Sequence, residues 1–198
     1  MKSTFFDRFA AYLIDTVVIT IITLIISFSL PETTGKAHDK IEELDKQLQA
    51  GEIMPQDYLD EFMNTPLQYN YQKEALIPSI ISITVVIAYF VVFQYMNKGQ
   101  TLGKKMMHIR VVNQQTEKPI SIGLGFIRSV LILNLASSIL SILYLYIINK
   151  NYYFNAYIIT AGVENLFILV SAFFILYRKD KIGLHDMMTK TKVIKERG

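Results

Sequence analysis

The stretch from Phe9 to Leu30 decides the fold of this chain, and it reads FAAYLIDTVVITIITLIISFSL. A helix needs about 20 apolar residues to cross the hydrocarbon core of a bilayer, and this stretch has that length, with Asp15 as its charged residue. In lipid such a segment must be helical, because only a helix satisfies its own backbone donors and acceptors. The stretch therefore predicts a membrane span rather than the core helix of a soluble protein.

Three further stretches are long and apolar enough to cross a bilayer: Leu76 to Met96, Ile120 to Ile148 and Tyr157 to Tyr177. The run from Ile120 is longer than a span needs, so we expect its first turns at the interface and the span proper to begin near Phe126. Hydrophobic residues make up 52% of the chain and charged residues 19%, and most of the charge lies between the four stretches. The sequence predicts an all-α membrane protein with four transmembrane helices, forming a single domain over residues 1–198.

The basic residues predict how these spans are oriented. Segments 1–8, 97–119 and 178–198 hold 14 lysines and arginines, whereas the other connections hold five. Connections rich in lysine and arginine stay in the cytoplasm. We therefore expect a multi-pass protein of the plasma (cell) membrane with cytoplasmic N- and C-termini.

The connection over residues 31–75 is too long to be structureless and carries ten carboxylates. Ile41, Leu44 and Leu48 recur at helical spacing before Gly51, a plausible helix end, and a second short helix can begin after Pro55. We interpret this segment as an extracytoplasmic, acidic helical hairpin inserted between the first and second spans. It is either a solvated cap or a surface that docks a partner or attracts cations.

The connection after the second span contains the sequence Gly99-Gln100-Thr101-Leu102-Gly103-Lys104-Lys105. It lacks the first glycine and the following Ser or Thr of a phosphate-binding loop. Thr101 is a candidate cap for a short helix through Met107. The alternating stretches 108–113 and 191–195 predict two short strands that pair beneath the membrane.

Charged residues within or at the edges of the spans are the candidate functional residues, because a charge in mid-bilayer is costly to insert. They are Arg8, Asp15, Arg128 and Glu164. Arg8 and Asp15 share one helix face. Asp15 can pair with Arg128, either as a structural ion pair or as part of a transport site. Glu164 can be a proton-binding site or a carboxylic acid that bridges helices.

The chain offers little for enzymatic chemistry. It has no cysteine, and its three histidines are far apart, without metal-ligand spacing. His185 and Asp186 are neighbours, so on a helix they are expected not to face each other. We expect no enzymatic activity, no cofactor and no metal. Nucleic acid is not an expected partner, because orientation and anionic lipid heads account for the basic residues.

Three motifs resemble those of the RDD family of small bacterial membrane proteins. The first is Arg8-Phe9-Ala10-Ala11-Tyr12-Leu13-Ile14-Asp15, the second runs from Gly99 to Lys105 into Ile109-Arg110-Val111-Val112, and the third is Gly183-Leu184-His185-Asp186. The resemblance implies that Arg8, Asp15 and Asp186 are the arginine and two aspartates that name the family. Two departures are His108, where a glycine is common, and Thr189-Lys190, which replaces a typical Ala-Gly pair.

Most members of that family have no assigned activity, and some are proposed to exchange sodium or other monovalent cations for protons. The resemblance and the intramembrane acids predict a secondary transporter of this kind. Asp15 would bind the proton or the cation, with Arg128 as its charge partner. Asp186 would be a second acid, and Glu164 would give access from the outer side. Such a small transporter is expected to form a homo-oligomer in the lipid bilayer. The alternative is a non-transporting accessory or immunity-type protein that binds another membrane protein through its acidic outer hairpin.

Overall fold

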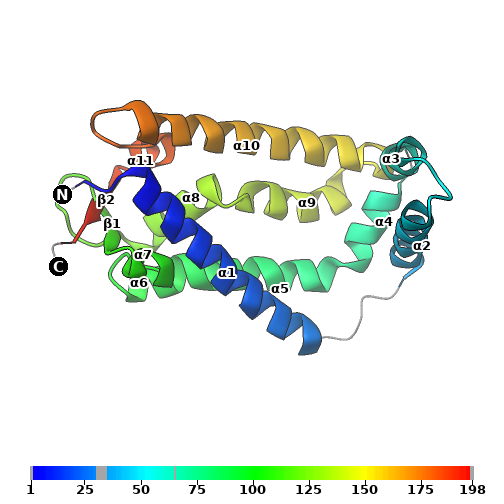
Figure 1. The fold of residues 1–198 in the computed structure, drawn as a ribbon, viewed down its shortest axis with the longest axis horizontal. Helices are drawn as coiled ribbons and strands as arrows, with labels where there is room; N and C mark the ends of the chain where they lie inside the picture. Colours follow the sequence, from blue (N-terminus) through cyan, green and yellow to red (C-terminus); the bar gives the residue numbers. More distant parts are fainter. Residues whose placement is uncertain (1, 30–34, 65, 197–198) are drawn as a thin grey trace.

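The computed structural model describes residues 2–29, 35–64 and 66–196. Leu30, at the end of the first predicted span, and residues 31–34 and 65 of the predicted insertion lie outside this range. The described chain is mostly helical (Figure 1). Long helices run along the molecule, both chain ends lie at one end of it, and three short helices cover the opposite end. We call these the terminal end and the far end.

Among the described residues, three helical segments are long and apolar enough to cross a membrane. The first is α1 (Phe5–Ser29), the second runs from Leu76 to Met96, and the third runs from Lys150 to Tyr177. The second consists of α5 (Leu76–Ile87), the π-helix η1 (Ala88–Phe93) and α6 (Gln94–Met96). The third consists of the 3-10 turn η2 (Lys150–Tyr152) and α10 (Tyr153–Tyr177). Large apolar side chains on these helices point outward, as expected for contact with lipid.

The first helix begins before the expected Phe9 because its N-terminus is capped. The Asp7 carboxylate accepts hydrogen bonds from the backbone N–H of Thr4 at 2.8 Å and from its hydroxyl at 2.9 Å. The Asp7 backbone N–H in turn donates to the Thr4 hydroxyl at 3.2 Å. This reciprocal pair satisfies donors that the first turn of a helix leaves free.

The predicted span from Ile120 to Ile148 is not one unbroken helix. The segment forms two helices, α8 (Ile122–Ile132) and α9 (Leu135–Ile147), bent by 81° at the break between them. Asn134 at the break has a φ of 54°, a left-handed conformation that cannot continue a right-handed helix. Taken as one broken span, the pair raises the number of candidate membrane crossings from three to four.

The terminal end confirms the predicted strand pairing. Strand β1 (Ile109–Asn113) pairs antiparallel with β2 (Thr191–Lys195), with Val111 opposite Val193. Two short helices, α7 (Leu102–Met106) and α11 (Leu184–Met188), flank this pair. Thr101 caps α7 as expected, since its hydroxyl accepts a hydrogen bond from the Lys104 backbone N–H.

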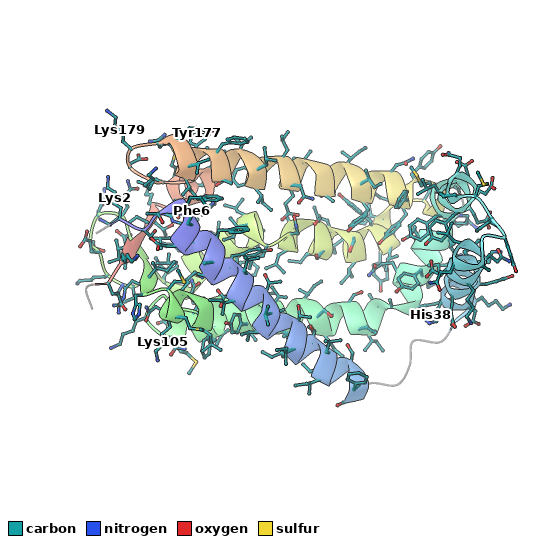
Figure 2. All side chains as sticks on the ribbon, in the orientation of Figure 1. Lys2, Phe6, His38, Lys105, Tyr177 and Lys179 are labelled. Atoms are coloured by element: carbon teal, nitrogen blue, oxygen red, sulfur yellow. The ribbon has the colours of Figure 1, made fainter. Side chains whose placement is uncertain are left out.

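The far end contains the predicted helical hairpin and one more helix. Helix α2 (Lys36–Ala50) ends at Gly51, which has a φ of 72°, and α3 (Pro55–Asn64) begins at the expected proline. The additional helix α4 (Leu67–Glu74) packs on α2. The Glu74 carboxylate accepts the backbone N–H groups of Ala37 and His38 at 3.1 and 3.0 Å, which caps α2. Figure 2 shows His38 at this end, whereas Lys2, Lys105 and Lys179 lie at the terminal end.

Candidate functional site

Asp186 anchors a buried ionic cluster at the terminal end. Arg8 Nη1 of α1 lies 2.6 Å from Asp186 Oδ2, and Arg128 Nη1 of α8 donates to Oδ1. The aspartate is fully buried. Burial alone would raise the pKa of its carboxyl, but the charges of Arg128 and Arg8 hold that pKa well below its usual range. The cluster therefore joins three segments that are distant in the sequence through one ionised carboxylate.

His185 also contacts this cluster, contrary to the expectation that neighbouring residues on a helix face apart. His185 Nε2 lies 3.4 Å from Asp186 Oδ1. Helix α11 is only five residues long, and the Asp186 side chain turns back to accept the Gly183 backbone N–H at 3.1 Å, which brings the carboxylate within reach of the imidazole. Burial, together with the charge of Arg128, lowers the pKa of His185 to about 3. The imidazole is therefore neutral at physiological pH, and its Nδ1 lies 2.6 Å from the Ser171 hydroxyl.

Asp15 is held by neutral groups. Its carboxylate accepts hydrogen bonds from the Tyr89 hydroxyl at 2.7 Å, the Thr101 hydroxyl at 2.5 Å and the Gly103 backbone N–H at 2.7 Å. Only 1% of the residue is exposed. Tyr89 lies on the π-helix η1, and Thr101 and Gly103 lie at the start of α7. Two elements, η1 and the start of α7, therefore converge on this carboxylate of α1 and supply three uncharged donors.

The candidate pair between Asp15 and Arg128 is not formed. Arg128 instead binds Asp186 and donates to the Thr191 hydroxyl at 2.7 Å. Within residues 2–29, 35–64 and 66–196, Asp15 has no ion-pair partner. The physical reason is the direction of the two side chains, because Asp15 faces α7 and η1 while Arg128 faces α11 and β2.

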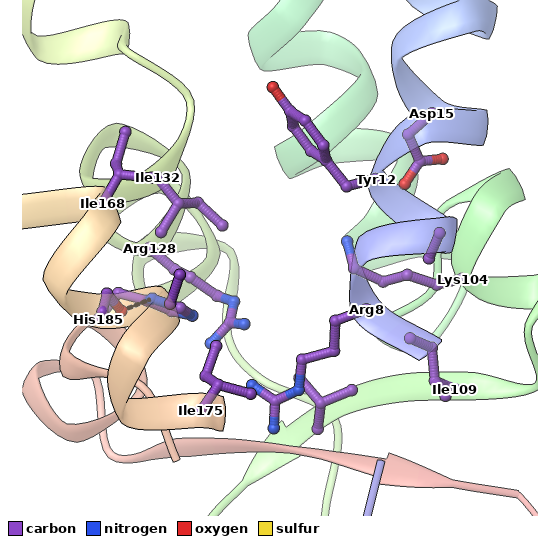
Figure 3. Close-up of a pocket in the computed structure, with 14 residues that line it drawn as sticks. Arg8, Tyr12, Asp15, Lys104, Ile109, Arg128, Ile132, Ile168, Ile175 and His185 are labelled. Atoms are coloured by element: carbon purple, nitrogen blue, oxygen red, sulfur yellow. Dashed lines mark hydrogen bonds between the residues drawn. The ribbon is translucent and has the colours of Figure 1, made fainter. Parts of the chain in front are cut away.

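A cavity of about 170 Å³ lies between these two carboxylate sites. Arg8, Asp15, Lys104 and Arg128 line it, together with apolar side chains from α1, α8 and α10. Figure 3 shows the cationic ends of Arg8, Lys104 and Arg128 directed toward the same space. Arg8 and Asp15 both border it, in agreement with the predicted shared helix face. Burial lowers the pKa of Lys104 to about 8, although Asp15 opposes this shift.

The motif from Gly99 to Lys104 builds the α7 side of this site. A Cβ on Gly103 would lie 2.1 Å from the Ala11 backbone oxygen, so glycine allows α7 to pack directly on α1 beside Asp15. Gly99 has a φ of 92°, and a Cβ there would lie 2.2 Å from the Val111 backbone oxygen. Gln100 donates to the Ile109 backbone oxygen at 3.0 Å, and Lys104 Nζ donates to Gln94 Oε1 at 2.6 Å.

Glu164 lies apart from this cavity. Its carboxylate accepts the backbone N–H groups of Ala136 and Ser137 at 3.2 and 2.9 Å, at the first turn of α9. These donors are freed by the break at Asn134, and in a bilayer they need a partner within the protein. The geometry matches the helix-bridging interpretation of Glu164 rather than a connection to Asp15.

Sequence reasoning missed several neutral members of the site, namely Tyr89, Gln94, Ser171 and Thr191. Each is buried and contacts a charged candidate or His185. Tyr89, Gln94 and Ser171 are polar residues in otherwise apolar spans, which is the signal that could have identified them.

Helices of this length and composition, together with a buried polar site at one end of the bundle, define a multi-pass membrane protein. The chain belongs to the RDD family, whose model matches residues 2–190. It is also similar to the uncharacterized protein YxaI of Bacillus subtilis (strain 168), with 26% identity over 191 residues that cover 96% of this chain and 95% of YxaI. No solved structure matches the chain.

The structure explains the two departures from the family motifs. His108 has a φ of 54° and Lys190 a φ of 50°, so both occupy the left-handed conformation that glycine adopts without strain. Both side chains are exposed. The chain therefore keeps the turns that a glycine would permit, and His108 and Lys190 adopt a strained backbone conformation in them.

Proposed function

We propose that the chain is a secondary transporter that exchanges sodium, or a similar monovalent cation, for protons at Asp15. We place it in the cell membrane with four crossings, the bent pair α8 and α9 being the third. We assign the terminal end to the cytoplasm, because it carries Lys2, Lys105 and Lys179 whereas the far end bears the acidic helices.

The observation that carries the proposal is the environment of Asp15. A carboxylate in a membrane span is costly, and a neighbouring arginine or lysine usually compensates its charge. Among the described residues Asp15 forms no such ion pair; its hydrogen-bond donors are neutral, and it borders a cavity that Lys104 also lines. Such a carboxylate can bind either a proton or a small cation, which is the competition that exchange requires.

The other acids have supporting parts in this proposal. Asp186 is paired with two arginines, which disfavours proton release and uptake near neutral pH. Glu164 caps α9 and stabilises the break in the bent pair. Asp15 is therefore the exchange site, and Asp186 and Glu164 hold the helices around it.

Proteoliposomes loaded with a pH-sensitive dye test the exchange. An outward sodium gradient should drive proton uptake into vesicles with the wild-type chain, and Asp15→Asn should abolish it. The matched control is Asp180→Asn, since Asp180 pairs with Arg178 just beyond α10 and does not line the cavity. Absence of flux with the wild type, or full flux with Asp15→Asn, would refute the proposal.

A second candidate is an accessory protein that binds another membrane protein through its far end. Helices α2, α3 and α4 share a core of their own around Ala37, Leu44 and Leu67. Leu59 and Met63 of α3 are exposed, as is Met54 just before this helix. Leu59→Lys with Met63→Lys should abolish partner capture if this surface binds a protein, and should leave proton flux unchanged if the chain is a transporter.

A further inference from the structure

The cavity between Asp15 and Asp186 has an excess of positive charge. Arg8, Lys104 and Arg128 direct three cationic groups toward it (Figure 3). Asp15 lines it with a carboxylate, and Asp186 supplies a second through its ion pairs with Arg8 and Arg128. His185, which also lines the cavity, is neutral. A low-dielectric site with an uncompensated positive charge is unfavourable unless an anion occupies it.

Arg128 has free hydrogen-bond donors in this cavity. Only 5% of the residue is exposed, and its Nη1 is engaged by Asp186 and Thr191. A guanidinium has five N–H donors. Among the residues that the structure describes, none accepts a hydrogen bond from Arg128 Nε or Nη2. A buried arginine with free donors at a cavity wall is suited to an oxygen-rich anion.

The remainder of the cavity is apolar and reaches the lipid-facing surface. Ile132 of α8 and Ile168 and Ile175 of α10 form much of its wall. Tyr12 of α1 also lines it and is 48% exposed on the first membrane helix. The cavity therefore connects the cationic side chains of Arg8, Lys104 and Arg128 to the region occupied by lipid acyl chains. Its ligand should combine an anionic head with an apolar tail.

We propose that this cavity binds the phosphodiester headgroup of an anionic phospholipid from the leaflet at the terminal end. The phosphate lies among Arg8, Lys104 and Arg128, and the acyl chains leave between α1 and α10. One negative charge balances the excess. The bound phosphate also lowers the positive potential that opposes a cation at Asp15, so lipid binding would support the proposed exchange without depending on it.

Native mass spectrometry of the full chain in detergent tests this proposal with phosphatidylglycerol and phosphatidylcholine as probes. Phosphatidylglycerol should bind at least about tenfold more tightly than phosphatidylcholine, because only the former carries a net negative charge. Lys104→Gln should reduce phosphatidylglycerol binding about five- to tenfold. The matched control is Lys105→Gln, which removes the same charge from the neighbouring, exposed position of α7 and should leave binding unchanged.

A second variant tests the apolar wall without altering any charge. Ala172→Phe enlarges a residue of α10 that lines the cavity, and it should also weaken binding of phosphatidylglycerol. Equal losses in Lys104→Gln and Lys105→Gln, or equal binding of the two lipids, would overturn the proposal. Displacement of the lipid by glycerol phosphate at similar concentration would show a site for soluble anions instead. The measurement needs no ion gradient, so its failure is distinct from failure of the exchange.

Discussion

The two ends of the molecule are stabilised in different ways. At the far end, helices that follow one another in the sequence bury Ala37, Leu44 and Leu67 and keep ion pairs such as Lys46–Glu42 on the surface. At the terminal end, Arg8, Arg128 and Asp186 meet from three distant segments and are buried.

This difference predicts different responses to mutation. An apolar core loses stability in proportion to the contacts removed, and the loss stays within the unit that the core stabilises. A buried ionic cluster fails as a whole, because removal of one partner leaves an uncompensated charge in a low dielectric. The far end should therefore behave as a separable cap, and the terminal end as the element that holds the helices in register.

The largest loss of stability is expected from Arg128→Met. The substitution leaves Asp186 with one arginine, and loss of a buried ionic partner lowers the free energy of unfolding by about 3–5 kcal/mol. Unfolding in detergent, followed by circular dichroism, measures this loss. The matched control is Lys46→Met, which removes an exposed ion pair and should leave the transition unchanged. Equal transitions for the wild type and Arg128→Met would show that the cluster does not stabilise the fold.

The next effect tests whether the far end is separable. Leu44→Ala removes a side chain that is 5% exposed from the small core and should lower local stability by about 2–5 kcal/mol. Hydrogen exchange should accelerate in α2, α3 and α4 and remain unchanged in β1 and β2. Faster exchange throughout the chain would show instead that the two ends unfold together.

A smaller effect concerns pH at the terminal end. His185 has a pKa of about 3 in the folded chain and 6.5 as its reference value, so between these values the unfolded chain binds an additional proton. Stability should therefore fall as the pH decreases below 6.5, by about 1.4 kcal/mol per pH unit. His185→Gln should flatten the dependence between pH 6.5 and 5. The control is His108→Asn, which replaces an exposed imidazole at a left-handed position that asparagine tolerates and should retain the slope.

The smallest effect is a gain in stability. His108→Gly and Lys190→Gly relieve left-handed strain at exposed turns of the terminal end, and each should stabilise the fold by roughly 0.5–1 kcal/mol. Lys105→Gly, within helix α7, is the matched control and should destabilise by about 1 kcal/mol. Melting temperatures of the three variants measure the difference. A loss of stability in His108→Gly would show that its side chain has a role that the strain argument ignores.

Local patterns in the sequence are enough to predict several helices, some of their ends, the strand pair and the family of this protein. Hydropathy predicts the apolar helices that include Phe9 and Leu76. Turn residues predict the helix end at Gly51 and the helix start at Pro55, and alternation predicts the strand at 109–113 and its pairing. The three family motifs likewise identified the RDD family. These features depend on neighbouring residues or on motifs that are continuous in the chain.

Tertiary structure alone decided which charges meet. By depth in the membrane, Arg128 is a reasonable partner for Asp15. Helix α11 instead places Asp186 against Arg128, and α7 brings Thr101 and Gly103 to Asp15. The break at Asn134 also escaped the hydropathy pattern, because an apolar run does not reveal that Glu164 of another helix satisfies the freed donors. Composition and spacing can show that a buried charge needs a partner, but the partner is selected by how distant segments pack in three dimensions.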